Sequence, residues 1–106
     1  MRNDFVIQKM IGIIEKLQSY TQGCDYEQFS ENDMLVEACV FNLGQLGETA
    51  NKIDEGFEEE HGEIPWRQIY GLRNRIIHDY EGINLNLIWE IIQDDLPELL
   101  NSLEQL

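Results

Sequence analysis

The sequence predicts an all-α fold, an antiparallel bundle of four to five helices, and three observations support that prediction. Apolar residues recur at spacings of three and four along most of the chain, which is the period of a helix with one buried face. The chain has only 2 prolines and few runs of β-branched residues. Short polar stretches separate the periodic segments, as in a bundle with short loops. With 106 residues, of which 42% are hydrophobic, residues 1–106 are expected to form a single domain with a modest core.

The first helix is expected to begin with Asp4 as its N-cap and to end near Tyr20. Its inward face is predicted from residues at helical spacing: Phe5, Ile7, Met10, Ile11, Ile14 and Leu17. The polar segment 21–29 that follows is predicted to be a loop.

A second helix is expected over about residues 32–53, because Ser30 and Asp33 resemble a capping box. Gly44 and Gly47 lie inside this helix, and each costs about 1 kcal/mol relative to Ala in a helix interior. Close approach of another backbone would offset that cost.

The acidic segment 54–63 is predicted to be a solvated loop. Pro65 suits the first position of a third helix, and Gly82 suits the C′ position just beyond its end. The apolar face of that helix is predicted to include Trp66, Ile69, Tyr70, Leu72, Ile76 and Ile77.

Asn84 can cap a fourth helix, which is expected to kink or restart near Asp95 because Pro97 removes an interior hydrogen bond. The segment after Pro97 is expected to continue as helix. Trp66 and Trp89 are predicted to anchor the core.

The net charge of −14 argues against broad, non-specific binding to nucleic acid, which needs clustered positive charge. It does not exclude a small site that holds one phosphodiester. No apolar run reaches the ~18 residues of a membrane span, and no signal peptide is visible, so a cytoplasmic protein is expected. Cys24 and Cys39 have no metal-ligand spacing and are interpreted as free thiols. His61 has no partners at ligand spacing, so no metal site and no cofactor are predicted.

The segment from Arg73 to Tyr80 carries the residues with the most distinctive chemistry. Arg73 lies five positions before His78, and Arg67 and Arg75 lie close by, so three of the 7 basic residues gather beside one imidazole. If all of 73–78 were helical, Arg73 and His78 would lie about 140° apart around the axis, whereas Asn74 and His78 would be stacked. One copy would then make an open site, and two copies meeting across a two-fold axis would bring two histidines and two arginines to one cleft.

Such a cleft could cleave RNA without a metal. A neutral imidazole can take the proton of a 2′-hydroxyl, whose oxygen then attacks the adjacent phosphorus. A protonated imidazole or a water molecule can give a proton to the leaving 5′-oxygen, and histidine can hold either state because its pKa of about 6.5 lies near neutrality. Arginine stabilises the negative charge that grows on the phosphate oxygens. The alternative interpretation is structural. Arg73 and Arg75 would be surface cations, and His78 would lie at a helix C-terminus, where the dipole favours a positive charge.

An ordered series of short motifs also resembles a known family. The series is Gly47-Glu48-Thr49-Ala50, Ile64-Pro65-Trp66, Gly71-Leu72-Arg73-Asn74, His78-Asp79-Tyr80, Gly82-Ile83-Asn84 and Leu96-Pro97. The chain resembles HEPN-domain proteins of the HepT-like type, whose signature is Arg, four residues, His, any residue and Tyr. Arg73, His78 and Tyr80 match this signature without a gap. The resemblance covers nearly the whole chain, although the strong acidity is a departure.

The resemblance implies a metal-independent ribonuclease toxin with a helical bundle and a homodimeric active cleft. It assigns Arg73 and His78 to the catalytic positions and Asn74 to the polar position beside them. It further implies an MNT-type nucleotidyltransferase antitoxin that silences the toxin by adding AMP to Tyr80. Glu48 could orient Arg73 or Asn74, and Arg75 could support the site.

Two other functions stay open from the sequence. The bundle could be a non-catalytic interaction module that dimerises and docks a nucleotidyltransferase, which the acidic charge favours. It could also be a nucleotide-sensing domain that uses the same arginines to hold the phosphate of a mononucleotide.

Overall fold

The computed structural model of the chain describes residues 2–78 and 82–106, without the side chain of His78. The helices are α1 (Arg2–Thr21), α2 (Tyr26–Ser30), α3 (Asp33–Ala50), α4 (Glu55–Glu60), α5 (Trp66–Tyr70), α6 (Leu72–Ile76), α7 (Leu85–Glu90), the π-helix η1 (Ile91–Asp95) and α8 (Leu96–Glu104). Two strands of two residues each, β1 (Ile77–His78) and β2 (Gly82–Ile83), form an antiparallel pair between α6 and α7.

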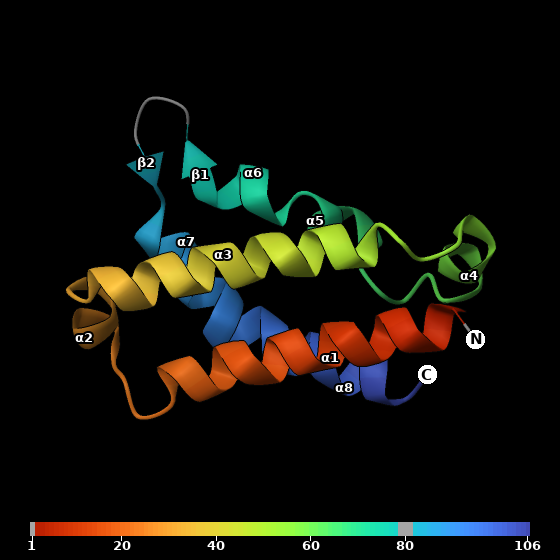
Figure 1. Cartoon of the computed structure of the whole chain (residues 1–106), viewed down its shortest axis with the longest axis horizontal. Helices are drawn as coiled ribbons and strands as arrows, with labels where there is room; N and C mark the ends of the chain where they lie inside the picture. Colours follow the sequence, from red (N-terminus) through yellow and green to blue (C-terminus); the bar gives the residue numbers. More distant parts are fainter. Residues whose placement is uncertain (1, 79–81) are drawn as a thin grey trace.

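The helices form an antiparallel bundle, so the all-α prediction is confirmed. Figure 1 shows α1 and α3 running side by side in opposite directions, with α5 and α6 along the other side of α3 and the α7–η1–α8 segment behind. One cluster of buried aliphatic and aromatic residues joins all of these segments. The hairpin of β1 and β2 projects beside the first half of α3 (Figure 1), and it positions the motif histidine.

The first helix begins earlier than the sequence analysis predicts. Helix α1 starts at Arg2, so Asp4 lies in its first turn and is not its N-cap. A carboxylate in the first turn still interacts favourably with the helix dipole, which explains why Asp4 marks this region correctly. The neighbouring Asn3 side chain instead accepts a hydrogen bond of 3.2 Å from the backbone of Asp54, and this bond ties the helix start to the loop after α3.

The predicted loop over 21–29 contains a short helix, so that prediction is wrong for its second half. Asp25 accepts a hydrogen bond from the backbone N–H of Gln28, and the Gln28 side chain accepts one from the backbone of Asp25. This reciprocal capping box begins α2. Helix α2 buries Phe29, whose ring lies 5.2 Å from that of Trp89.

The predicted capping box at Ser30 is also wrong. Ser30 is the last residue of α2, and its hydroxyl donates to the carbonyl of Glu27. Asn32 caps α3 instead, because its side chain accepts from the backbone N–H of Leu35 at 3.1 Å. The helix itself is confirmed, although it ends at Ala50, three residues before the predicted end.

The acidic segment after α3 forms the short helix α4, where the sequence analysis predicts only a loop. Glu55 and Glu58 lie in its first turn, where the dipole favours carboxylates, and Phe57 packs against the core with its ring 6.4 Å from that of Trp66. Burial and the nearby Glu58 carboxylate raise the pKa of Tyr70, whose buried hydroxyl has no hydrogen-bond partner among the described residues. Helix α4 therefore covers the α5 end of the core.

Of the two glycines inside α3, Gly47 allows the backbone of α5 to approach closely, as predicted. A Cβ placed on Gly47 would lie 2.8 Å from the carbonyl oxygen of Ile69 and 3.4 Å from that of Tyr70. A Cβ placed on Gly44 would lie 3.9 Å from Cδ of Arg73, which is an ordinary contact. Gly47 is therefore sterically required, whereas Gly44 leaves a shallow surface on which the Arg73 side chain lies.

The last helical segment changes its winding before Pro97, which confirms the predicted disturbance near Asp95. The proline has no N–H and its ring crowds the preceding turn, so a regular α-helical ladder cannot pass through it. The backbone N–H of Leu96 instead donates to the carbonyl of Ile91, five residues earlier, and η1 is the wider turn that results. Asn84 caps α7 as predicted, and α8 continues to Glu104.

Candidate functional site

The motif segment does not continue the helix that precedes it. Helix α6 ends at Ile76, and Ile77 and His78 are extended and pair with Ile83 and Gly82. The prediction that Arg73 and His78 share one helix is therefore wrong, as is the stacking of Asn74 on His78. Gly82 is likewise not a C′ residue, but its φ of +81° does require the conformational freedom of glycine.

Asn84 fixes the base of this hairpin. Its backbone N–H donates to the carbonyl of Ile76 at 2.8 Å, and its side chain accepts from the N–H of Leu87 at 3.1 Å. Asn84 thus provides a hydrogen-bond partner for a backbone carbonyl at the end of α6 and for a backbone N–H at the start of α7. The β-branched residues on both sides, Ile76, Ile77 and Ile83, favour extended backbone and are the sequence signal for the hairpin. The segment 77–83 is consequently anchored at both ends, beside α6 and α7.

Arg73 is exposed on α6, and the aliphatic part of its side chain lies against α3 at Gly44. The only ion pair among residues 2–78 and 82–106 joins His61 Nδ1 to Glu63 Oε2 at 3.6 Å, so no carboxylate of the described part neutralises Arg73. A guanidinium in that position can bind phosphate oxygens in a bidentate manner.

Asn74 is also exposed on α6, and Glu48 is exposed on α3 one turn beyond Gly44. Within the described chain neither residue makes a side-chain hydrogen bond, and Glu48 makes no ion pair with Arg73. An orienting contact from Glu48 to Arg73 or Asn74 therefore stays a prediction.

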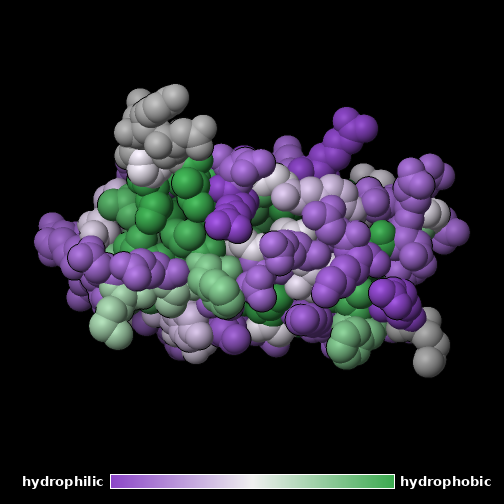
Figure 2. Space-filling model, turned by 45° about the horizontal axis from the view of Figure 1, so that its top comes forward, coloured by the Kyte–Doolittle hydropathy of each residue, from purple (hydrophilic) through white to green (hydrophobic). Residues whose placement is uncertain are grey.

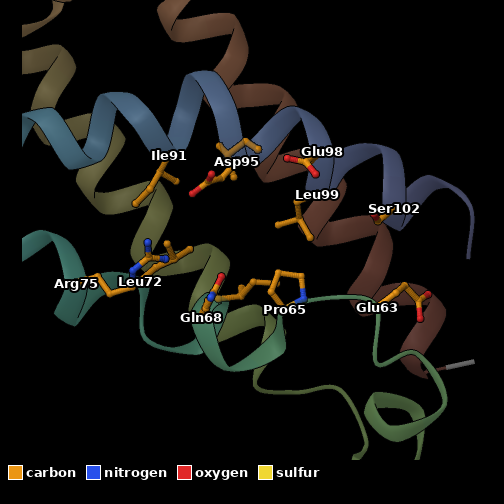
Figure 3. Close-up of a pocket in the computed structure, with 12 residues that line it drawn as sticks. Glu63, Pro65, Gln68, Leu72, Arg75, Ile91, Asp95, Glu98, Leu99 and Ser102 are labelled. Atoms are coloured by element: carbon orange, nitrogen blue, oxygen red, sulfur yellow. The ribbon is translucent and has the colours of Figure 1, made fainter.

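Arg75 faces a different part of the molecule from Arg73. It lines a cavity of about 320 Å³ between the α5–α6 segment and the η1–α8 segment. Figure 3 shows Arg75 on the α6 side of this cavity, and Asp95 and Glu98 on the opposite helix. Glu63 is a third acid on the rim, so three carboxylates face one guanidinium there. That balance repels a phosphodiester, so the Arg75 cavity is poorly suited to an anion.

Tyr80 and Asp79 lie outside the described residues, as does the side chain of His78. The assignment of Tyr80 as a modification site therefore stays a prediction, and so does the catalytic pairing of His78 with Arg73. The backbone of His78 is described, and it follows α6 directly.

An apolar surface lies next to the hairpin. Figure 2 shows strongly hydrophobic residues gathered in one area there, at the end of the molecule where α3 begins. Ile83 is 39% exposed, and Phe41 on α3 is 65% exposed. Partly buried residues that pack on the core nearby are Val40, Ile77, Leu85 and Leu87. The sequence analysis missed Phe41, although an aromatic residue between Val40 and Asn42 in an otherwise amphipathic helix departs from the pattern of a polar outer face.

Other candidate chemistry is absent from the described part of the chain. Residues 2–78 and 82–106 contain no cluster of three or more His, Cys, Asp or Glu side chains that could hold a metal. Within the same ranges no helix combines the length and the apolar character that a membrane crossing needs. Cys24 and Cys39 are free, and burial, together with the neighbouring Cys24, raises the pKa of Cys39 to about 11.

Comparison with known proteins gives consistent results. The model of a family described as "Ribonuclease HepT-like" matches residues 10–106. A protein named "Putative RNase" from Caldanaerobacter subterraneus is 31% identical over 103 residues, which are 97% of this chain and 88% of that protein. Another "Putative RNase", from Methanocaldococcus jannaschii, is 35% identical over 80% of this chain and 78% of its own length. A "Probable ribonuclease HepT" from Thermococcus cleftensis is 30% identical over 88% of this chain and 84% of its own length. No significant match exists among solved structures.

Proposed function

The chain belongs to the ribonuclease HepT-like family, and from this premise we propose that it is a metal-independent RNA endonuclease and the toxin of a toxin–antitoxin pair. The observation that carries the proposal is the position of Arg73. It is an exposed cation without a carboxylate partner among the described residues, and it lies on the helix that leads directly into His78. In a chain with a net charge of −14, an exposed guanidinium without a carboxylate partner among the described residues, on the helix that precedes His78, is a suitable place for a single phosphate.

The proposed reaction needs only these side chains and the substrate. Neutral His78 accepts the proton of a 2′-hydroxyl, and the 2′-oxygen attacks the adjacent phosphorus. The bond from phosphorus to the 5′-oxygen breaks, and a protonated imidazole or a water molecule supplies the leaving oxygen with its proton. Arg73 stabilises the negative charge on the phosphate oxygens as it grows, and Asn74 donates a hydrogen bond beside it. The products are a 2′,3′-cyclic phosphate and a free 5′-hydroxyl.

The complete site is proposed to form between two copies of the chain. The apolar surface beside the hairpin supports this, since burying Ile83 and the aliphatic residues Ile77, Leu85 and Leu87 against the same residues of a second copy would also bring the two motif segments together. Two-fold symmetry then supplies one imidazole as base and the other as acid.

The test of the activity is RNA cleavage by the purified chain in the presence of EDTA. We expect cleavage of single-stranded RNA, with 2′,3′-cyclic phosphate ends detectable by mass spectrometry. An otherwise identical oligonucleotide with a 2′-deoxy residue at the cleaved position should stay intact, because it lacks the nucleophile. Cleavage of both substrates, or products without a cyclic phosphate, would contradict the proposed mechanism.

We further propose that Tyr80 is the point of control and that an MNT-type nucleotidyltransferase is the cognate antitoxin. Each AMP added to Tyr80 would place a phosphate two residues from His78, where it repels RNA and competes for Arg73. After coexpression with such an enzyme, intact-mass measurement should show additions of AMP that disappear in Tyr80→Phe. The Tyr80→Phe variant should also resist silencing. An unmodified chain that the partner still silences would favour control by docking alone.

A second function, a non-catalytic module that docks the nucleotidyltransferase, is supported by the strong acidity. The EDTA assay separates the two proposals, because the module would bind its partner without cleaving RNA.

A further inference from the structure

Phe41 is an exposed aromatic residue on α3 that the proposed reaction does not use. Its side chain is 65% exposed although it is large and apolar. A phenylalanine left in water forfeits roughly the 1.5–3 kcal/mol that its burial would contribute, so it has no structural reason to be there. We propose that Phe41 is a platform on which a base of single-stranded RNA stacks, next to the phosphate that Arg73 holds. This inference rests on the proposed ribonuclease function and adds a binding residue to it.

The position of Phe41 relative to Arg73 follows from α3. Gly44, three residues later in the helix, is the residue on which the Arg73 stem lies, with 3.9 Å between Cδ and a Cβ placed on the glycine. Residues three apart in a helix are neighbours, about 4.5 Å apart along the axis and about 60° apart around it. Phe41 is thus the adjacent exposed side chain on the outer face of α3.

The same register brings Phe41 toward the hairpin. Helix α3 and the α5–α6 segment run in opposite directions (Figure 1), with Gly47 against Ile69 and Gly44 against Arg73. One more turn toward the start of α3 corresponds to about three residues further along the other segment. Phe41 therefore lies at the level of Ile76 and Ile77, where α6 passes into β1 and His78 follows.

An aromatic ring beside a cation is the combination that single-stranded nucleic acids bind, because the cation contacts a phosphate and the ring stacks on any base. Electrostatics alone would not suffice on this face. Glu37 and Glu48 are both exposed on α3 and repel a polyanion. Stacking supplies an attraction that does not depend on charge, which explains how so acidic a chain could hold its substrate.

The test compares Phe41→Leu with Phe41→Tyr in steady-state cleavage of a single-stranded RNA oligonucleotide. Leucine keeps an apolar surface and loses the aromatic face, whereas tyrosine keeps the face. We expect Phe41→Leu to raise KM roughly 5- to 150-fold, the range for losing one stacked base, with kcat little changed. Phe41→Tyr should retain the KM of the parent. Phe5→Leu is the matched control, because Phe5 is 71% exposed and lies near the start of α1, which begins at the end of the bundle away from the hairpin (Figure 1).

Light scattering on each variant separates stacking from packing between copies of the chain. If Phe41 packed against a second copy of the chain, leucine would largely preserve that contact. Loss of the contact would appear as a lower molar mass of the variant in solution. Equal KM values for Phe41→Leu and the parent would overturn the proposal, as would equal losses in the leucine and tyrosine variants.

A binding measurement keeps the inference testable if the parent chain cleaves nothing. In the His78→Ala background, Phe41→Trp should show fluorescence quenching on addition of oligouridylate beyond that of His78→Ala alone, which retains Trp66 and Trp89. Quenching without cleavage by the parent would contradict the proposed activity and support the stacking site. No additional quenching would overturn the stacking site by itself.

Discussion

Replacing Arg73 by alanine should lower RNA cleavage by about 10²- to 10³-fold, the usual effect of removing one group that stabilises a developing oxyanion. The loss should fall mainly on kcat, because the charge on the phosphate oxygens grows toward the transition state. The fold should be unaffected, since Arg73 is exposed and alanine favours a helix at least as well as arginine. Far-UV circular dichroism and cleavage rates on the same preparation measure both effects.

The matched control is Arg67→Ala. Arg67 is also exposed, lies on α5, and its loss changes the net charge by the same amount. A charge effect on bulk RNA binding would appear in both variants, whereas a specific contact at the scissile phosphate would appear only at Arg73. Arg73→Lys should keep part of the activity, because the charge stays and the bidentate geometry is lost. Similar rates for the Arg67 and Arg73 alanine variants would remove Arg73 from the site.

His78→Ala should cost about 10²- to 10⁴-fold in the same assay, the range for losing general acid–base catalysis. A mixed dimer of His78→Ala and Arg73→Ala protomers holds one imidazole and one arginine from different protomers, so it should regain part of the activity if both groups reach one cleft and a water molecule replaces the second imidazole. Mixed dimers that stay fully inactive would show that one imidazole and one arginine from different protomers do not suffice for cleavage.

Helix content and the glycine contacts were predictable from the sequence, because both follow from local patterns. The spacing of apolar residues defines α1 and α3, and the pair Gly44 and Gly47 indicates a close helix neighbour. The short helices were missed because the polar residues that begin them are also typical of loops. The capping box of Asp25 and Gln28 is the clearest example, since it is complete in the sequence but sits in a polar stretch.

The geometry of the candidate site was less predictable. Apolar residues at helical spacing from Trp66 to Ile77, with Gly82 as a C′ residue, indicated a helix through His78. The structure ends the helix at Ile76, where the Asn84 N–H takes the carbonyl that a longer helix would have used. That hydrogen bond joins residues eight positions apart, and neither helical nor strand periodicity in the sequence indicates it. The family signature was still identified correctly, because it depends on the order of residues and not on their conformation.

Gly47→Ala should destabilise the protein and lower its activity, whereas Gly44→Ala should do neither. The added methyl at position 47 would lie 2.8 Å from the carbonyl of Ile69, which is closer than real contacts allow, so the backbone of α5 must move. Overpacking of this kind costs about 1–3 kcal/mol, against about 1 kcal/mol gained when alanine replaces glycine in a helix interior. Because α5 leads directly into α6, its displacement also moves Arg73.

The same substitution at Gly44 gives the control within the same helix. A methyl there would lie 3.9 Å from Cδ of Arg73, at ordinary contact distance, so the helix gains about 1 kcal/mol without a clash. Urea unfolding should therefore show a lower midpoint for Gly47→Ala and a higher one for Gly44→Ala. Cleavage should fall in Gly47→Ala. In Gly44→Ala the rate should stay within about threefold of the parent, which corresponds to a change of less than about 1 kcal/mol in activation free energy. If both variants were stabilised equally, α5 would not rest on Gly47, and Arg73 would be held in place by other contacts.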